Sequence, residues 1–188
     1  EGEREILPNP NRDEQWLRRL FERAVAGFYQ VTLKKQWTVR PSLQQHWPVS
    51  SASPGAKQIL PQMENDIWLE HKDTKRRVII DTKFTQILNP NRYEQQKLHA
   101  KYLYQMYTYL RTQEKSEDTA SISAEGLLLH PAVNLTVDEA LVIQGHRIRF
   151  ATLDLSANTA EIRRQLLEVL SPDKHSLQDE CLESENRP

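Results

Sequence analysis

The chain has 188 residues, with 25 Lys and Arg against 26 Asp and Glu, so its formal net charge is -1. Hydrophobic residues make up 38% and there are only 5 glycines, which excludes a wholly disordered or collagen-like chain. This length is typical of one domain, or at most two small ones. Every apolar run falls well short of the roughly 20 residues that span a bilayer, so we expect no membrane association.

The only cysteine, Cys181, excludes an internal disulfide and any cysteine-based metal or iron–sulfur site. No secretory leader opens the chain, and we therefore expect a cytoplasmic protein. A net charge near zero argues against strong, indiscriminate nucleic-acid binding, which needs many uncompensated cations. A local basic groove remains compatible with this charge.

The first half of the chain predicts a helix followed by extended segments. Residues 1–12 form a polar lead-in, and apolar side chains then recur at spacings of three and four, which predicts an amphipathic helix over residues 13–30. Its apolar stripe comprises Trp16, Leu17, Leu20, Phe21, Ala24, Val25 and Phe28. Residues 31–50 predict one or two extended stretches, and residues 50–58 predict a loop.

Two segments of strand character follow at residues 63–70 and 76–84, with a hairpin turn between them. A polar connection at residues 85–93 leads to a second amphipathic helix, predicted over residues 94–112. Residues 113–124 predict a charged loop.

The last third predicts a strand, a hairpin and a helix. Three consecutive leucines indicate a buried strand at residues 125–133. Segments 140–143 and 147–155 predict a hairpin around Gln144-Gly145-His146, and residues 158–170 predict a helix capped by Asn158 or Thr159. Residues 172–188 predict a flexible acidic tail. This order favours an α/β fold, with a mixed central sheet flanked by helices in one domain over residues 13–171.

The segment Val78–Phe84 combines an apolar strand pattern with two charged residues. Alternate residues of a strand share a face, so Asp81 and Lys83 point one way while Val78, Ile80, Thr82 and Phe84 form an apolar face. Pairing with the preceding strand brings Asp66 close to Asp81. Two neighbouring carboxylates repel unless a cation lies between them, and oxygen ligands favour Mg²⁺ or Mn²⁺.

Such a site suits phosphodiester hydrolysis, because a divalent ion activates water and Lys83 can stabilise the charge that develops on phosphorus. The alternative is that Asp81 and Lys83 form an exposed ion pair worth roughly 0–1 kcal/mol. The upstream Asp66, the apolar run and the helix that follows favour the metal site. Lys97 and Lys101, four residues apart on the predicted helix, are candidates for binding DNA phosphates.

The pattern Asp66 … Asp81-Thr82-Lys83 resembles the signature of the PD-(D/E)xK nuclease superfamily, whose core has the order αβββαβ. The resemblance is closer to McrC, the nuclease subunit of modified-cytosine-dependent restriction systems. It covers roughly residues 13–170 and rests also on the stretches at 60–67, 79–84, 99–106 and 126–131. On this resemblance we expect the chain to correspond to the C-terminal nuclease half of such a subunit, without the N-terminal half that engages the motor partner.

The resemblance implies a role for each matching residue. Asp66 and Asp81 would bind the metal with the Thr82 carbonyl, and Lys83 would be the catalytic lysine. Glu22 matches the acid that often completes the site from the first helix, although a solvated helix charge is an equal alternative. Gln105 and Tyr109 match a Gln-x-x-x-Tyr element that contacts nucleic acid in related nucleases, although a tyrosine used in helix packing has the same pattern.

The function implied is that of a Mg²⁺-dependent DNA endonuclease, the cutting module of a McrBC-type, GTP-driven restriction complex. Its partners would be double-stranded DNA carrying modified cytosine and an AAA+ GTPase motor subunit resembling McrB. Two alternatives remain open: another PD-(D/E)xK nuclease, such as a repair or recombination exonuclease, and a non-catalytic interaction module with the same fold.

Overall fold

The computed structural model describes residues 10–90 and 96–171. The predicted acidic tail and residues 1–9 of the predicted lead-in lie outside these ranges. The elements are, in chain order, α1 (Pro10–Thr32), β1 (Trp37–Gln45), α2 (Ala56–Ile59), β2 (Met63–His71), β3 (Arg77–Thr82), β4 (Leu88–Pro90), β5 (Gln96–Leu98), α3 (Ala100–Thr112), α4 (Thr119–Ile122), β6 (Glu125–Pro131), β7 (Asp138–Ile143), β8 (His146–Leu153) and α5 (Thr159–Glu168).

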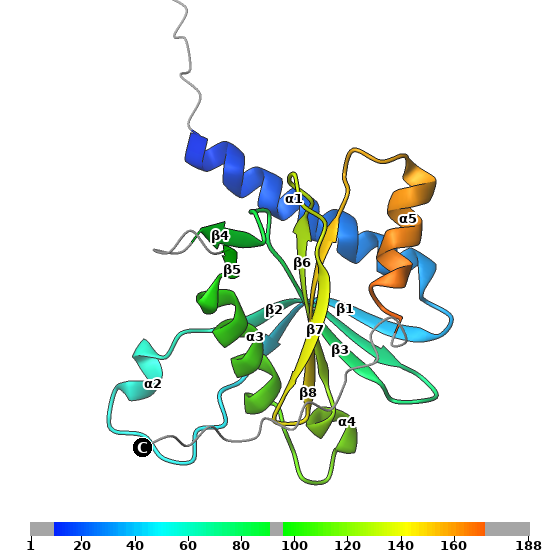
Figure 1. The fold of residues 1–188 in the computed structure, drawn as a ribbon. Coiled ribbons are helices and arrows are strands. Elements are labelled where there is room, and N and C mark those ends of the chain that lie inside the picture. Colours follow the sequence, from blue (N-terminus) through cyan, green and yellow to red (C-terminus); the bar gives the residue numbers. More distant parts are fainter. Residues whose placement is uncertain (1–9, 91–95, 172–188) are drawn as a thin grey trace, which may run out of the picture.

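Six strands form one mixed sheet in the order β1-β2-β3-β6-β8-β7, and β4 and β5 form a separate pair. The pairs β1–β2, β2–β3 and β7–β8 are antiparallel, whereas β3, β6 and β8 run parallel to one another. Helix α3 lies on one side of the sheet, and α5 lies on the other with α1 (Figure 1). The predicted class, a mixed sheet flanked by helices, is confirmed.

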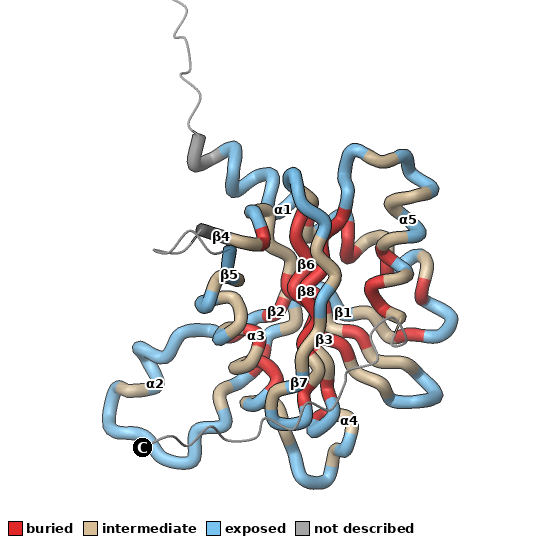
Figure 2. The backbone as a smooth tube through the Cα atoms, in the orientation of Figure 1, coloured by how far each residue is buried: buried red, intermediate tan, exposed pale blue. Residues whose placement is uncertain are grey.

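The sheet separates two hydrophobic clusters because alternate residues of each strand face opposite sides. Ile80, Leu127 and Leu129 pack with α1 and α5, whereas Ile79, Leu128 and Phe150 pack with α3. The buried positions follow the central strands, and the segment around α2 is largely exposed (Figure 2). The central strands therefore provide the packing surfaces for the helices on both sides of the sheet.

Helix α1 buries only its C-terminal half. Phe21, Val25 and Tyr29 are buried, but Trp16 is 62% exposed and Leu20 is 47% exposed. The predicted amphipathic helix is confirmed, but the first turns of its apolar stripe are exposed, because the helix there extends past the sheet (Figure 1). No helix within the described ranges has the length and apolar character needed to cross a bilayer.

The second predicted helix begins later than expected, because β5 occupies residues 96–98 and α3 starts at Ala100. Strand β5 pairs with β4, with Leu98 opposite Leu88, and both leucines pack against the α3-side cluster. Hydrogen bonding to β4 satisfies the backbone of this segment in an extended form. Lys97 therefore lies on a strand, and its predicted helical spacing to Lys101 was wrong.

Local signals in the last third of the chain were reliable. The predicted β7–β8 hairpin is confirmed, and its loop is two residues, Gln144 and Gly145, both with positive φ, because His146 pairs with Ile143. Asn158 caps α5 by accepting a hydrogen bond from the backbone N–H of Glu161 at 3.0 Å.

Two short helices, α2 and α4, lie in segments predicted as loops.

Gly126 on β6 marks the closest approach between the sheet and α3. A Cβ at this position would lie 2.6 Å from Met106 Cγ and 2.7 Å from Met106 Sδ. We therefore expect Gly126→Ala to lower the free energy of unfolding by about 1–3 kcal/mol, because Met106 is fully buried and must move.

The matched control is Gly27→Ala in α1, where a Cβ would meet nothing within 4 Å. This substitution is expected to raise stability by about 0.5–1 kcal/mol through helix propensity. Urea unfolding of both variants measures the difference. Equal stability of the two variants would contradict tight packing at Gly126.

Candidate active site

Strands β2 and β3 bring the two predicted metal-binding acids together. Ile67 pairs with Ile80 and Trp68 pairs with Ile79, so continuing this antiparallel register sets Asp66 opposite Asp81. Both side chains belong to the face that carries Ile79, which is the face covered by α3. Two carboxylates thus meet at the end of a buried strand pair, as the sequence pattern predicted.

The backbone pairing between β2 and β3 stops at this point. The Thr82 N–H donates to Oδ2 of Asp66 at 2.7 Å, and the Thr82 hydroxyl donates to the same oxygen at 2.7 Å. The next N–H, that of Lys83, donates to the Leu129 carbonyl on β6 at 2.9 Å. In an extended strand the N–H and C=O of one residue face the same neighbour, so the Thr82 carbonyl is expected to face Asp66 as well.

Asp81 is a buried carboxylate with one oxygen left without a donor. Its side chain is 1% exposed, Oδ2 forms an ion pair with Lys83 Nζ at 2.5 Å, and Oδ1 has no hydrogen-bond partner. Burial and, to a lesser degree, the Asp66 carboxylate raise the pKa of Asp81 to about 7, although the Lys83 ammonium opposes both. A buried oxygen of this kind is costly unless a proton or a cation reaches it.

Glu22 approaches the same region from α1. The carboxyl is half-buried and accepts a hydrogen bond from the Ser42 hydroxyl at 3.5 Å. Its pKa is raised by burial, by the charge of Asp66 and, to a lesser degree, by that of Glu64. The first-helix acid implied by the resemblance is therefore within electrostatic reach of Asp66 and Asp81.

These acids do not form a metal site by carboxylates alone. Across residues 10–90 and 96–171, no three acidic, histidine or cysteine side chains converge closely enough to hold a metal ion. The donor set at this position is two carboxylates, Asp66 and Asp81, plus the expected Thr82 carbonyl. Magnesium commonly keeps several waters and needs only one or two protein carboxylates, so this oxygen-only set fits it.

Gln105 and Tyr109 connect α3 to β2. The Gln105 amide donates to the Tyr109 hydroxyl at 2.6 Å, and that hydroxyl donates to the Glu64 carbonyl at 2.6 Å. Tyr109 is 6% exposed, and burial raises its pKa to about 12. The pair braces β2 two residues before Asp66, and its contact with nucleic acid stays a prediction.

Lys97 and Lys101 are both exposed on the α3 side of the fold. Lys97 belongs to β5, and Lys101 belongs to the first turn of α3, with its Nζ 4.7 Å from the centre of the Tyr102 ring. Their role in binding phosphate stays a prediction.

Two residues near Lys83 had no functional role in the sequence prediction. Tyr102 on α3 has its ring centre 5.0 Å from Lys83 Nζ, and His130 on β6 lies beside Tyr102 with ring centres 5.9 Å apart. Thr82 pairs with Leu129 in the parallel strands β3 and β6, so the residues that follow them, Lys83 and His130, are neighbours. Pairing these two strands from the sequence would therefore have indicated His130. No sequence signal linked Tyr102 to Lys83, because that contact depends on where α3 packs.

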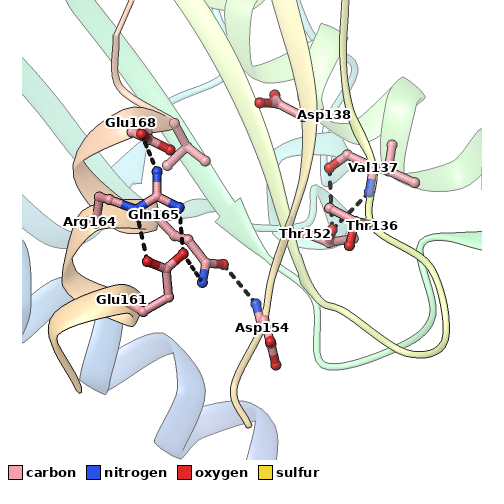
Figure 3. A pocket seen from close by; sticks show the side chains of 10 residues that line it. Thr136, Val137, Asp138, Thr152, Asp154, Glu161, Arg164, Gln165 and Glu168 are labelled. Atoms are coloured by element: carbon pink, nitrogen blue, oxygen red, sulfur yellow. Dashed lines mark hydrogen bonds and ion pairs between the residues drawn. The ribbon is translucent and has the colours of Figure 1, made fainter. Parts of the chain in front are cut away.

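A pocket elsewhere in the molecule contains none of the predicted site residues. It measures about 330 Å³ between the β7–β8 hairpin and α5, and Figure 3 shows its lining. Asp138, Asp154, Glu161 and Glu168 line it, and Arg164 forms ion pairs with Glu161 and Glu168. An acidic lining of this kind is unsuited to a polyanion such as DNA.

Comparison with known sequences identifies the family. No curated protein matches the chain significantly. The sequence pattern of a family described as "McrBC 5-methylcytosine restriction system component" matches residues 17–131, which span α1 to β6 and include Glu22, Asp66, Asp81 and Lys83. Because the match covers more than half of the chain, the protein belongs to the family of McrBC 5-methylcytosine restriction system components.

Proposed function

We propose that this chain is a Mg²⁺-dependent DNA endonuclease module of the PD-(D/E)xK type, the cutting part of a McrBC-type restriction complex. The observation that carries the proposal is the buried Asp81, which lies opposite Asp66, is paired with Lys83 and keeps one oxygen without a donor. A structural ion pair alone would leave that buried oxygen with neither a hydrogen-bond donor nor a cation. A divalent cation shared by the two carboxylates accounts for it.

The order of elements supports the same assignment. Helix α1, strands β1, β2 and β3, helix α3 and strand β6 follow the αβββαβ order that the resemblance implies. Strand β6 is parallel to β3 and lies directly beside it, so both strands end on the same edge of the sheet as the acidic pair. The reacting groups would thus occupy one end of the sheet, between α1 and α3.

Asp66, Asp81 and the Thr82 carbonyl would hold the ion. When bound, Mg²⁺ supplies Lewis acidity, which offsets phosphate charge and favours ionisation of water. Asp66 is already oriented, because two donors from Thr82 fix its Oδ2. Asp81 would lose its proton as its oxygen turns to the cation.

Lys83 would provide the positive charge at the phosphate. Its ammonium is mostly buried, with 17% of the side chain exposed, and it lies against Asp81. A cation held in a partly desolvated site stabilises the charge that develops on the phosphorus oxygens more strongly than a solvated one. Glu22 would complete the site from α1, and Lys97 and Lys101 would bind the DNA backbone from the α3 side.

The DNA would be double-stranded, would carry modified cytosine, and would be delivered by an AAA+ GTPase motor. Support comes from the family membership and from the net charge of -1, which leaves little general attraction for DNA. The chain's own contribution would be cleavage, while recognition would belong to the partner.

The test is a cleavage assay with methylated supercoiled and linear DNA, using the chain alone and with its GTPase partner. We expect nicks or breaks in circular DNA with Mg²⁺ or Mn²⁺ and GTP, and none with a chelator. Degradation that needs a free DNA end would favour the exonuclease alternative. No cleavage with any divalent ion, with or without the partner, would favour a non-catalytic module.

A further inference from the structure

We propose that Tyr102 is a positioning residue that holds the Lys83 ammonium against Asp81, and that the buried His130 fixes the Tyr102 ring in place. The inference rests on the proposed function in one respect, namely that Lys83 is the catalytic lysine. The contact itself exists independently of metal or DNA.

Lys83 needs a second restraint besides its ion pair. A lysine carries a compact charge on a flexible four-carbon stem, so a single carboxylate does not fix the position of the ammonium. The Tyr102 ring centre lies 5.0 Å from Lys83 Nζ, within the range of a cation–π interaction. Because only 17% of the Lys83 side chain is exposed, water competes weakly with this contact.

His130 restrains Tyr102 from the sheet. It follows Leu129, which pairs with Thr82, and so it neighbours Lys83 across the two parallel strands. Its ring lies 5.9 Å from the Tyr102 ring at an angle of 56°. His130 is 2% exposed, and its Nδ1 lies 2.9 Å from the Thr85 carbonyl, which requires Nδ1 to be the donor.

His130 is also uncharged beside the lysine. Burial lowers its pKa to about 4, and the positive charge of Lys83 acts in the same direction. At neutral pH it therefore presents a neutral ring, which packs against Tyr102 without repelling the ammonium. His99 contacts the same tyrosine from the start of α3, with ring centres 4.9 Å apart.

The competing explanation is that Tyr102 serves only Lys101, whose Nζ lies 4.7 Å from the same ring centre. Lys101 is exposed, so that role would affect DNA binding and leave Lys83 unchanged. The two explanations differ in what happens to Lys83 when the ring is altered.

The first measurement is NMR of the metal-free protein labelled with ¹³C-lysine, with the Lys83 signal identified by its loss in Lys83→Met. We expect the Lys83 ε-methylene protons to be shifted upfield by the Tyr102 ring current in wild type and in Tyr102→Phe. The shift should vanish in Tyr102→Leu and persist in the control Tyr104→Leu, whose tyrosine on the same helix is 67% exposed.

The second measurement is single-turnover DNA cleavage. Tyr102→Leu is expected to lower the cleavage rate about tenfold with little change in the DNA concentration for half-saturation, whereas Tyr102→Phe stays near wild type. Pentafluorophenylalanine at position 102 keeps the ring's shape but reverses its quadrupole. It should lower the rate as Tyr102→Leu does, and it keeps the test valid if the leucine variant fails to fold.

An unshifted Lys83 signal in wild type, or a shift that survives Tyr102→Leu, would overturn the contact. Normal cleavage with pentafluorophenylalanine would overturn its role in positioning Lys83. If wild type cleaves nothing, the proposed function fails instead, and the NMR shift alone decides whether Tyr102 holds Lys83.

Discussion

Lys83→Ala is expected to reduce metal-dependent DNA cleavage by at least about 100-fold while the protein stays folded. The substitution removes the only ammonium paired with Asp81 in the described structure. The fold should survive, because Asp81 can take up a proton once Lys83 no longer opposes the rise in its pKa. Single-turnover cleavage of methylated plasmid with Mn²⁺, together with circular dichroism, measures both effects.

Two further variants separate charge from packing. Lys83→Met keeps the apolar stem without the ammonium and should lose as much activity as Lys83→Ala. Lys35→Ala removes an exposed lysine that belongs to no predicted site and should cleave like wild type. Undiminished cleavage by Lys83→Ala would remove the nuclease assignment at this site.

Asp81→Asn should make the metal-free protein more stable at neutral pH, by about 2 kcal/mol, because it removes a buried charge that lacks full compensation. In a domain of this size that corresponds to a rise in the melting temperature of roughly 4–8 °C. The same variant should lose the stabilisation by Mg²⁺ or Mn²⁺ that wild type shows. A site that gains stability when its acid is neutralised is typical of a functional carboxylate.

The pH dependence that Asp81 gives to the stability of the metal-free protein has a defined sign. The folded protein holds the Asp81 proton up to a pKa of about 7, whereas the unfolded chain releases it near 3.8. Between these values the folded state binds more protons, so the contribution of Asp81 to stability falls as pH rises and stays low above pH 7. The advantage of Asp81→Asn should therefore be small at pH 4 and largest at pH 8.

Metal-induced stabilisation should follow the opposite trend, growing from pH 5 to pH 8 as binding no longer has to displace the proton. Thermal unfolding at these pH values, with a chelator or with Mn²⁺, measures both effects. Asp73→Asn in the exposed β2–β3 turn is the matched control, and it should change neither the stability of the metal-free protein nor its stabilisation by metal. An Asp81→Asn protein that is less stable than wild type at pH 8 would show that Asp81 is a structural ion-pair partner.

Much of the geometry of the candidate site was predictable because it is local. Asp81 and Lys83 share a strand face by alternation alone, and the short turn between β2 and β3 sets the register that brings in Asp66. Glu22 was predictable only through the family resemblance, since nothing in helical periodicity distinguishes it from a solvated acid. Its raised pKa depends on α1 packing near Asp66.

Other expectations failed where contacts between elements overrode the periodicity of the sequence. The stripe beginning at Trp16 has good helical spacing, but the sheet ends before those turns of α1, so they remain exposed. Residues 96–98 have a pattern compatible with helix, yet pairing with β4 keeps them extended. For α1 the deciding factor is where the sheet ends, and for residues 96–98 it is pairing with residues 88–90 just upstream.

The amino-acid sequence on its own determined the succession of the main strands and helices, the face of β3 that carries Asp81 and Lys83, and the resemblance to restriction components. Alternation, turns and motifs are properties of neighbouring residues, and they did not predict α2, β4, β5 or α4. The tertiary structure alone decided that Asp81 is buried with one oxygen that lacks a hydrogen-bond donor, and that Tyr109 donates a hydrogen bond to β2. It also decided that Tyr102 lies against Lys83 and His130 against Tyr102. Those features depend on desolvation and on contacts between α3 and three strands, which no local pattern encodes.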